Sequence, residues 1–365
     1  MRNFNLLLIL TLCSITCLAQ NVPSEPIRGT WITNVASDVL KSKANIRKAV
    51  KQCKDNGLNH IFVVVWNGGV TMYPSQVVKK YIGIAQSKVY KGRDPIKEII
   101  EEGHKAGIKV HAWFEFGFSY GYKDTNSVWL KKYPSWAGRN NKKELLQKNG
   151  FYWWSSINPE VQKFMKELVS EVVKKYDVDG IQGDDRLPAM PAEGGYDNTT
   201  IKLYKTQHGG VLPPDNPKDA IWLQWKADQL SAFGKSLYEK VKKIKPECTV
   251  SWAPSIYPWS KEQYLQDWPK WLEGGYADYI IPQLYRYKPE AYETILKELQ
   301  MQVPDRFKNR VFPGILTSLG DGYQSTREMT DKMIQLNRDY GFNGEVFFYF
   351  ETLNRLKGGI YNNIN

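Results

Sequence analysis

Eight short apolar segments, each followed by an amphipathic one, are the feature that most limits what this chain can fold into. The run Ile61–Val65 is continuously apolar rather than alternating, which is typical of a parallel strand buried on both faces. We expect strands at 28–35, 59–66, 108–116, 178–183, 249–253, 279–284, 310–315 and 344–350. We expect helices at 45–56, 94–105, 159–176, 220–243, 264–273, 290–302 and 326–340.

Regular alternation of strands with helices indicates an α/β fold with a parallel sheet. The count of eight strands and the absence of a nucleotide-binding glycine fingerprint favour a single (β/α)₈ barrel of the TIM type over a doubly wound sheet. The 365 residues suffice for one such barrel, which we place at residues 26–356, with 357–365 as a short tail. Since only 14 residues follow Glu351, the last helix is short or absent.

The first 19 residues read as a secretory signal. One positive charge at Arg2 precedes a short apolar run and small residues around Ala19, and the run is too short to favour a membrane span. A lipid anchor on Cys17 is the less favoured alternative. We therefore expect an exported protein, periplasmic or secreted, in which Cys53 and Cys248 are two buried thiols rather than one bridge.

The net charge of the chain indicates which binding partners to expect. There are 50 Lys and Arg against 38 Asp and Glu, a formal net charge of +12. This excess fits either a solvated lysine-rich surface or association with anionic glycans at the periphery of the cell envelope. The basic residues form pairs rather than a run, so we expect no nucleic acid partner. No Cys/His spacing suggests a metal, no motif suggests a cofactor, and we expect a monomer.

Acidic residues at strand ends carry the expected chemistry. Catalytic groups of α/β barrels lie at the C-terminal ends of the strands, and the acids there are Asp38, Glu115, Asp184, Asp185 and Glu351. Neighbouring side chains on an extended chain alternate in direction. We therefore expect only one of Asp184 and Asp185 to be catalytic, and Asp184 is the preferred candidate. The other aspartate would orient Arg186 or a loop backbone.

A pair of carboxyl groups at this end of a barrel is suited to glycoside hydrolysis, in which one group donates a proton and the other attacks the sugar or activates water. Asp184 would therefore need a second carboxyl group as its partner. Glu115 lies in Trp113-Phe114-Glu115-Phe116, and Glu351 follows Tyr349-Phe350, so both have apolar neighbours that would raise the pKa of a general acid. The sequence leaves both open as the partner of Asp184. Long segments at 117–158 and 184–219 follow the third and fourth strands and belong to the same face of the barrel.

Six further residues are expected to bind substrate. Gln283, Tyr285 and Arg286 end the sixth strand with amide, phenol and guanidinium groups suited to sugar hydroxyls or a carboxylate. The aromatic residues Trp113, Trp252 and Tyr196 offer flat faces to sugar rings, as expected for about half of the many aromatics, with the rest in the core.

In this order the motifs resemble the bacterial glycosyl-hydrolase-like family 10, a barrel group distantly similar to the α-amylase superfamily. The matching stretches include Arg28-Gly29-Thr30-Trp31, Ala112–Phe118, Asn158-Pro159-Glu160-Val161, Tyr176–Asp185, Gly195-Tyr196-Asp197, Gln266-Asp267-Trp268-Pro269, Gln283–Arg286 and Phe347–Glu351. The resemblance implies a sugar polymer as substrate, and some relatives act on peptidoglycan glycan strands. Two positions depart from it: Gly183 stands where relatives carry a bulkier residue, and Arg186 where an aromatic residue or His is common. The fifth strand, Ser251-Trp252-Ala253-Pro254, also lacks the acid/base Glu of the α-amylase superfamily.

We therefore expect an exported glycoside hydrolase with a two-carboxylate mechanism, acting on a polysaccharide such as peptidoglycan glycan strands. A carboxyl separation near 5–5.5 Å would indicate retention, and about 6.5–9.5 Å inversion. The rival is a non-catalytic glycan-binding barrel of the envelope, whose acids would be bridged to Arg or Lys. A metal-dependent deacetylase barrel is a weaker alternative, because His is scarce near the acids.

Overall fold

Eight parallel strands form the centre of the molecule in the computed structural model, which describes residues 23–319, 322–353, 356 and 360–361. The strands are β1 Arg28–Ile32, β2 His60–Val64, β5 Lys109–Phe114, β9 Gly180–Gly183, β10 Thr249–Trp252, β11 Tyr279–Ile280, β12 Gly314–Leu316 and β13 Glu345–Phe348. Their order is β11-β10-β9-β5-β2-β1-β13-β12, with parallel pairing throughout.

The two outer strands of this order also meet, and so the sheet closes on itself. Phe312 N–H donates to the Ile280 carbonyl at 3.0 Å, and Gly314 N–H donates to the Pro282 carbonyl at 2.8 Å. Isolated parallel bridges join the same segments. The predicted eight-stranded α/β barrel is confirmed, and its core is the apolar interior and outer surface of this ring.

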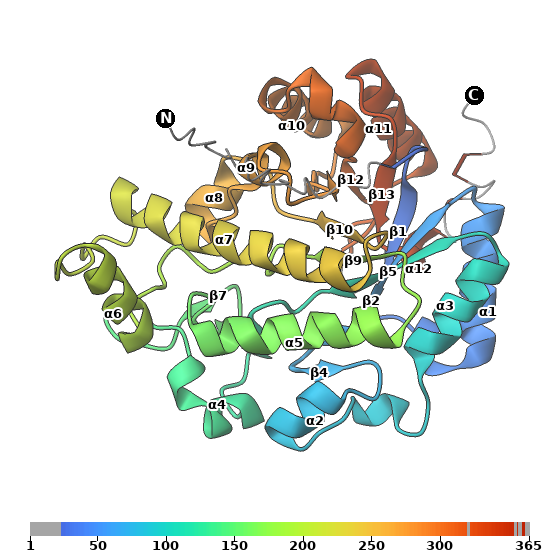
Figure 1. Cartoon of the computed structure of the whole chain (residues 1–365). Helices are drawn as coiled ribbons and strands as arrows, with labels where there is room; N and C mark the ends of the chain where they lie inside the picture. The colour runs from blue at the N-terminus through green and yellow to red at the C-terminus, as the bar shows by residue number, and fades with distance from the viewer. Residues whose placement is uncertain (1–22, 320–321, 354–355, 357–359, 362–365) are drawn as a thin grey trace, which may run out of the picture.

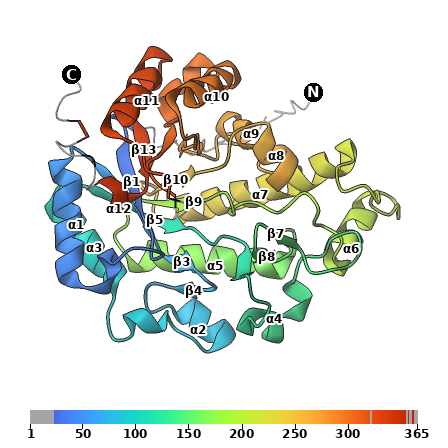
Figure 2. The same cartoon turned by 180° about the vertical axis from the view of Figure 1, so that it is seen from behind.

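A helix follows every strand and covers the outside of the barrel (Figure 1, Figure 2). These helices are α1 Lys43–Asp55, α3 Pro95–Lys105, α5 Pro159–Lys175, α7 Ala220–Ile244, α9 Trp268–Glu273, α10 Pro289–Gln302, α11 Arg327–Asp339 and α12 Phe350–Leu353. The last has only four residues, in agreement with the expected short helix. Among the described helices, none is long and apolar enough to cross a membrane.

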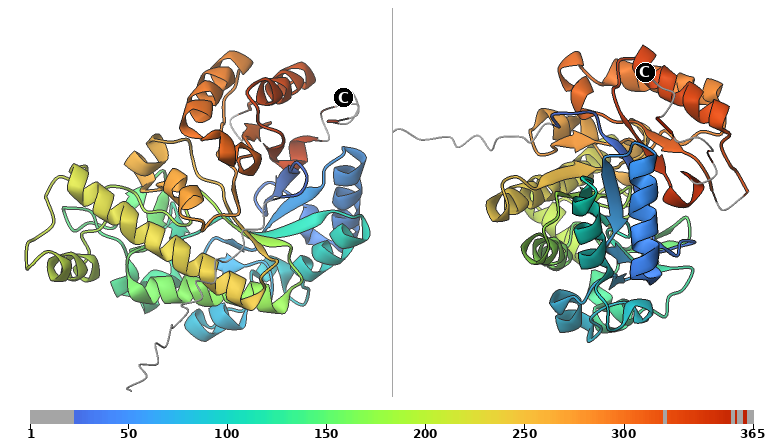
Figure 3. Two further views of the ribbon diagram at one scale, coloured as in Figure 1. Left: turned by 45° about the horizontal axis from the view of Figure 1, so that its top comes forward. Right: turned by 90° about the vertical axis from the view of Figure 1, so that its right-hand side faces the viewer.

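Further elements lie in the loops at the C-terminal ends of the strands. They are β3 Trp66–Asn67, β4 Val70–Thr71, α2 Gln76–Ile82, β6 Ser119–Tyr122, α4 Val128–Lys132, β7 Gln147–Lys148, β8 Phe151–Trp153, α6 Asn198–Gln207 and α8 Trp259–Tyr264. Short 3₁₀ helices occur at Val39–Lys41, Lys88–Tyr90, Pro134–Trp136 and Asp305–Arg310. These insertions form a broad layer on one side of the barrel (Figure 3).

Boundaries differ from the prediction where proline interrupts a pattern. β11 ends at Ile280 rather than 284, because Pro282 has no N–H to donate to a ladder. β12 starts at Gly314 rather than 310, since Arg310 ends a 3₁₀ helix and Pro313 follows. The helix expected at 264–273 begins only at Trp268, as α9, and a separate helix, α8, ends before it and is capped by Leu265, whose φ of 63° is left-handed.

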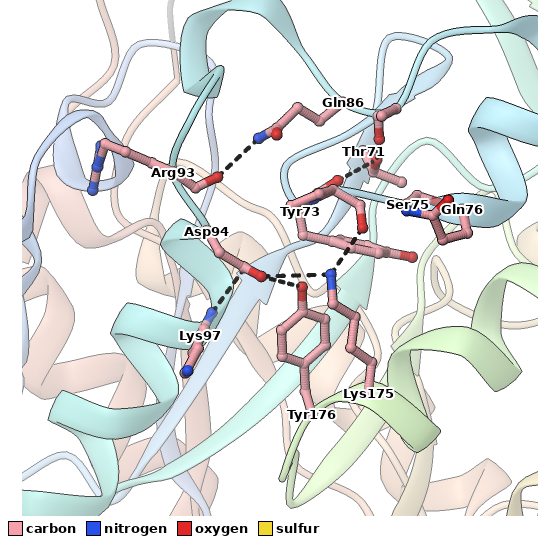
Figure 4. A network of polar contacts seen from close by, with 12 residues as sticks. Thr71, Tyr73, Ser75, Gln76, Gln86, Arg93, Asp94, Lys97, Lys175 and Tyr176 are labelled. Atoms are coloured by element: carbon pink, nitrogen blue, oxygen red, sulfur yellow. Dashed lines mark hydrogen bonds and ion pairs between the residues drawn. The ribbon is translucent and has the colours of Figure 1, made fainter.

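A polar network fixes the insertion after β2 to two barrel helices (Figure 4). Asp94 caps α3 by accepting from Lys97 N–H at 3.2 Å, and it also accepts from the Tyr176 hydroxyl at 2.7 Å. Lys175, at the end of α5, lies 3.5 Å from Asp94 and donates to the Pro74 carbonyl at 2.8 Å. The loop that carries Asn67 is therefore anchored at its far end.

The expected signal peptide at residues 1–19 lies outside the described residues. Cys53 and Cys248 are free and buried, which confirms two buried thiols. Burial raises the pKa of the Cys248 thiol to about 12, so it is not a nucleophile at neutral pH.

Candidate active site

Two acidic side chains share one guanidinium group at the C-terminal end of β9, and a third acid, Glu115, follows β5 near enough for its charge to act on Asp184. Arg186 lies 3.0 Å from Asp184 and 2.8 Å from Asp185, measured between guanidinium nitrogen and carboxylate oxygen. Its Nε donates to the Glu115 carbonyl at 2.9 Å, and the group lies 4.6 Å from the centre of the Phe151 ring. Glu115, Asp184 and Asp185 thus belong to one cluster.

Both aspartates contact Arg186 because the strand ends before them. β9 stops at Gly183, and Leu187 N–H donates to the Asp184 carbonyl at 3.0 Å to form a turn. Asp184 and Asp185 therefore do not lie on an extended strand, and their side chains need not point in opposite directions. Exposure separates the two: the Asp184 side chain is 5% exposed and that of Asp185 is 30% exposed.

Gly183 is required by this packing. A Cβ added there would lie 2.3 Å from the Leu187 carbonyl oxygen and 2.5 Å from the Trp252 ring. The absence of a side chain lets the turn with both aspartates fold back onto β10. The sequence departure at Gly183 therefore has a structural cause.

Hydrogen bonds hold the carboxyl groups of Asp184 and Glu115 in place. Gln283 Nε2 donates to Asp184 Oδ1 at 2.8 Å, while Arg186 takes the other oxygen. Glu115 Oε2 accepts from the Thr33 hydroxyl at 3.0 Å and from Asn67 Nδ2 at 2.9 Å. Within the described residues, the other oxygen of Glu115 has no hydrogen-bond donor.

Burial dominates the electrostatics of this cluster. Burial raises the pKa of Glu115 to about 6, against the opposing effect of Arg186. Burial and the charge of Asp185 raise the pKa of Asp184 well above its ordinary value, with Arg186 opposing and Glu115 adding to the rise. Both carboxyl groups therefore keep a proton to a higher pH than they would in water, because burial disfavours their charged forms.

Glu351 lies apart from the three acids. The Ser37 hydroxyl donates to it at 2.7 Å, and it lines a separate hollow of about 250 Å³ together with Asp38. Of the two carboxyl groups that the sequence left open, the structure brings Glu115 to Asp184 and not Glu351.

The expected substrate-binding residues divide into two groups. Gln283 contacts Asp184, and burial with the nearby charge of Asp184 raises the pKa of Tyr285 well above its ordinary value, which places both beside the acids. Arg286 is partly exposed next to them and donates to the Tyr285 carbonyl at 2.8 Å.

The three aromatic residues that were expected to bind sugar rings are buried, and this expectation is corrected. Trp113 is 2% and Trp252 0% exposed, so neither ring presents a face to a ligand. Trp113 packs inside the barrel against Trp31, with 6.3 Å between ring centroids, and Trp252 donates to the Tyr276 carbonyl at 3.3 Å. Tyr196 is 4% exposed and lines a different hollow.

Most tryptophans belong to the core, contrary to the expected half. Within the described ranges, Trp259 at the start of α8 is the one tryptophan among the exposed large apolar residues, with 44% of its surface accessible. It contacts Tyr264 at 5.5 Å between ring centroids, and the charge of Asp185 contributes to the raised pKa of Tyr264. Trp259 therefore lies one ring away from the surroundings of the acids.

The sequence prediction missed Thr33, Asn67 and Gln266. The first two bind Glu115, and Gln266 Nε2 donates to the Asp184 carbonyl at 3.1 Å. Asn67 directly follows the second predicted strand, so extending the survey of strand ends from acids to amides would have found it. Gln266 comes from a loop and had no such signal.

Comparisons with known proteins identify the family and agree with the fold. The family model described as glycosyl hydrolase-like 10 matches residues 26–324. The glycosyl hydrolase DigH of Escherichia coli O6:H1 is 27% identical over 303 residues, which cover 72% of this chain and 66% of DigH. The chain thus spans slightly less than two thirds of that relative. The glycosyl hydrolase YngK of Bacillus subtilis is 23% identical over 96% of this chain and 73% of its own length.

Two solved structures share the fold. The PgaB (BpsB) glycoside hydrolase domain from Bordetella bronchiseptica has a TM-score of 0.69 at 14% identity, over 88% of this chain and 94% of that one. The catalytic domain of β-amylase from Paenibacillus polymyxa has a TM-score of 0.63 at 11% identity, over 90% and 93% of the two chains. At these identities the likeness concerns the fold alone.

Proposed function

The chain belongs to the glycosyl hydrolase-like 10 family, and we propose that it cleaves glycosidic bonds in a polysaccharide with Asp184 and Glu115 as the two carboxyl groups. The observation that carries the proposal is the ion pair of Asp184 with Arg186, whose guanidinium also donates to the main-chain carbonyl of Glu115, at the ends of two strands of a barrel that shares its fold with a glycoside hydrolase domain. A glycosidase needs one carboxyl group that donates a proton and one that attacks the sugar or activates water.

The hydrogen-bond donors decide which group holds the proton. Both oxygens of Asp184 accept from N–H donors, of Gln283 and Arg186, and such donors stabilise a carboxylate. Glu115 keeps one oxygen without a donor among the described residues, and its pKa is raised to about 6. We assign Glu115 as the general acid and Asp184 as the nucleophile or base.

Supporting roles follow from the contacts. Thr33 and Asn67 fix one oxygen of Glu115 and leave the other for the leaving group. Arg186 orients both aspartates and is itself held over Phe151. Asp185 is a positioning residue that acts through Arg186, and no metal or cofactor is needed for these steps.

One observation favours the rival function, a non-catalytic glycan-binding barrel. Both aspartates are ion-paired with Arg186, as expected for acids with a structural role. The general-acid assignment of Glu115, whose second oxygen remains available, favours the enzyme.

The test measures cleavage and binding separately. Wild type and Asp184→Asn are incubated with isolated peptidoglycan and with a panel of neutral and acidic glycans, and the released reducing ends are quantified. Cleavage by wild type, together with binding but no cleavage by Asp184→Asn, supports the enzyme. Binding without cleavage of any glycan by wild type supports the rival.

We further propose export to the periplasm or the medium, with the envelope polysaccharide as partner. This rests on the N-terminal sequence pattern. Fractionation of cells that express the full chain, with immunodetection of a shortened product outside the cytoplasm, tests it.

A further inference from the structure

A second hollow, distinct from the acidic cluster, lies between the segment 134–143 and the start of helix α6. It has a volume of about 440 Å³, and Arg139, Lys143 and the first residues of α6 line it. None of Glu115, Asp184 and Asp185 is among its lining residues. Figure 1 and Figure 2 both show α6 beside the β7 strand, at the end of the molecule away from α1 and α3.

The two basic side chains bring more positive charge to the hollow than its single acid, Asp197, offsets. Arg139 Nη1 donates to the Lys143 carbonyl at 3.3 Å, and Lys143 Nζ donates to the Tyr196 carbonyl at 2.9 Å. In the part of the chain that the structure describes, neither makes an ion pair. Since a guanidinium has five N–H donors and an ammonium three, most of their donors remain available.

Helix α6 adds the positive end of its dipole. Its cap, Asp197, also lines the hollow, but both oxygens of this carboxylate accept from Thr200, at 3.0 Å from the amide and 2.8 Å from the hydroxyl. The first-turn residues Asn198 and Thr199 line the hollow as well. Their amides precede the first intrahelical bonds and are suited to an anion.

The Lys143 position is built into a fixed turn. Asn140 Oδ1 accepts from the amides of Lys142 and Glu144 at 3.0 Å and 2.9 Å, and Lys143 itself has a left-handed φ of 65°. A residue that is not glycine costs free energy in this conformation, and the bond from Arg139 helps to hold it. The ammonium group is therefore directed to the hollow by the backbone.

We propose that this hollow is a subsite that binds the carboxylate of an acidic saccharide. The charges of Arg139 and Lys143, less that of Asp197, leave one net positive charge, which matches a monoanionic carboxylate better than a phosphate dianion. The guanidinium can pair with both carboxylate oxygens, and Ser135 and Thr199 supply hydroxyl groups for the sugar.

The hairpin that carries the subsite is followed directly by the hairpin that reaches Arg186. Arg139 pairs with Leu145, and Lys148 pairs with Phe151, the residue under Arg186. Lys148 lies three positions after Leu145, which is roughly 10 Å of extended chain at about 3.3 Å per residue. This inference rests on the proposed function, because it makes the acidic sugar part of the cleaved polymer.

Titration with monosaccharides tests the subsite without requiring cleavage. The probes are N-acetylmuramate and D-glucuronate, with the methyl ester of each as a neutral control, and acetate and inorganic phosphate as free anions. Binding is measured calorimetrically at low ionic strength, where exposed charges are least screened. At least one acid should bind wild type about tenfold more tightly than its ester.

The variants separate the subsite from the overall basic charge. Lys143→Gln and Arg139→Gln should each weaken that acid about tenfold. Arg139→Lys should retain part of the affinity. Lys142→Gln removes an equal charge from the neighbouring exposed residue, which does not line the hollow, and should have no effect. Thermal melts check that each variant is folded.

Equal affinity for acid and ester, or an equal loss in Lys142→Gln, would overturn the proposal. Acetate or phosphate binding as tightly as the acidic sugars would replace it with a site for free anions. The titrations are repeated in Asp184→Asn. If carboxylate binding persists but wild type cleaves nothing, only the proposed function fails. If wild type cleaves neutral glycans and the acids do not bind, only the subsite fails.

Discussion

Buried acidic residues are paired differently at the two ends of the barrel. At the N-terminal ends of the strands, Asp278 lies 2.7 Å from Lys242, and Glu345 accepts from Arg338 at 2.7 Å and 2.9 Å. At the C-terminal ends, the carboxylates of Asp184 and Asp185 share the guanidinium of Arg186, and the carboxyl group of Glu115 lies near enough for its charge to act on Asp184. Matched charges hold the first end together, whereas excess carboxyl groups give the second end raised pKa values and a proton to donate.

This contrast follows the general division of labour in α/β barrels, where chemistry lies at the C-terminal ends of strands and stability at the N-terminal ends. It also explains why burial alone does not identify a functional acid. Glu345 is 0% exposed and yet fully paired, whereas the partly exposed Glu115 has an oxygen without a donor among the described residues.

The largest expected effect is on activity, at the C-terminal end. Asp184→Asn should lower kcat by roughly 10³–10⁴-fold. The unfolding free energy should change by less than about 1 kcal/mol, because Asn keeps the shape and Arg186 retains Asp185. Steady-state kinetics on the substrate found in the glycan panel, and urea unfolding, measure the two quantities. A fall in kcat below about tenfold would remove Asp184 from the chemistry.

The next largest effect is on the stability of the fold and concerns the buried ion pair at the N-terminal ends of the strands. Glu345→Gln leaves Arg338 without its carboxylate and should lower the unfolding free energy by about 3 kcal/mol. The activity of the folded fraction should remain unchanged. The matched control is Asp55→Asn, which breaks the exposed pair with Lys51 and should cost less than about 1 kcal/mol. Equal losses in both variants would show that burial of the Glu345 pair is not what matters.

A smaller effect concerns pH. The pKa of Glu115 is raised to about 6 from 4.5 in an exposed Glu, so the folded state holds this proton more tightly than the unfolded state does. Its stabilising effect is complete below about pH 4.5 and is lost as the pH rises through 6, a difference of about 2 kcal/mol. Urea unfolding from pH 4 to 8 should show this loss in wild type and a smaller loss in Glu115→Gln.

The same titration should appear in the kinetics. A general acid acts only when protonated, so wild-type kcat/KM should fall as the pH rises above about 6. Glu115→Gln should lose that limb together with most of its activity. An unchanged alkaline limb in the residual activity of Glu115→Gln would assign the proton to Asp184 instead.

The smallest expected effect tests Trp259, the exposed tryptophan that packs against Tyr264. Trp259→Ala should raise KM about tenfold and leave kcat within about twofold, because a stacked sugar ring contributes to binding and not to the chemical step. Met301→Ala, an exposed apolar residue on the outer helix α10, serves as control. A loss in kcat without a change in KM would contradict a role as a sugar platform.

The fold could be predicted almost entirely from the sequence, and the site in part. All eight barrel strands overlap their predicted segments and extend past them by at most one residue, although several are shorter, because continuous apolar runs and helix caps are local signals. The positions of Glu115 and Asp184 at strand ends followed from the same pattern. The prediction that Trp113 and Trp252 bind sugars was wrong, because the sequence does not distinguish these buried tryptophans from the exposed Trp259.

The sequence by itself determined the order of strands and helices and the end of the barrel where the acids lie. Only the tertiary structure decided which acids meet and which oxygens receive donors. Thr33, Asn67, Glu115, Asp184 and Gln283 come from five separate strand ends. Closure of the barrel brings these ends together in space, and no local pattern encodes the distances between them.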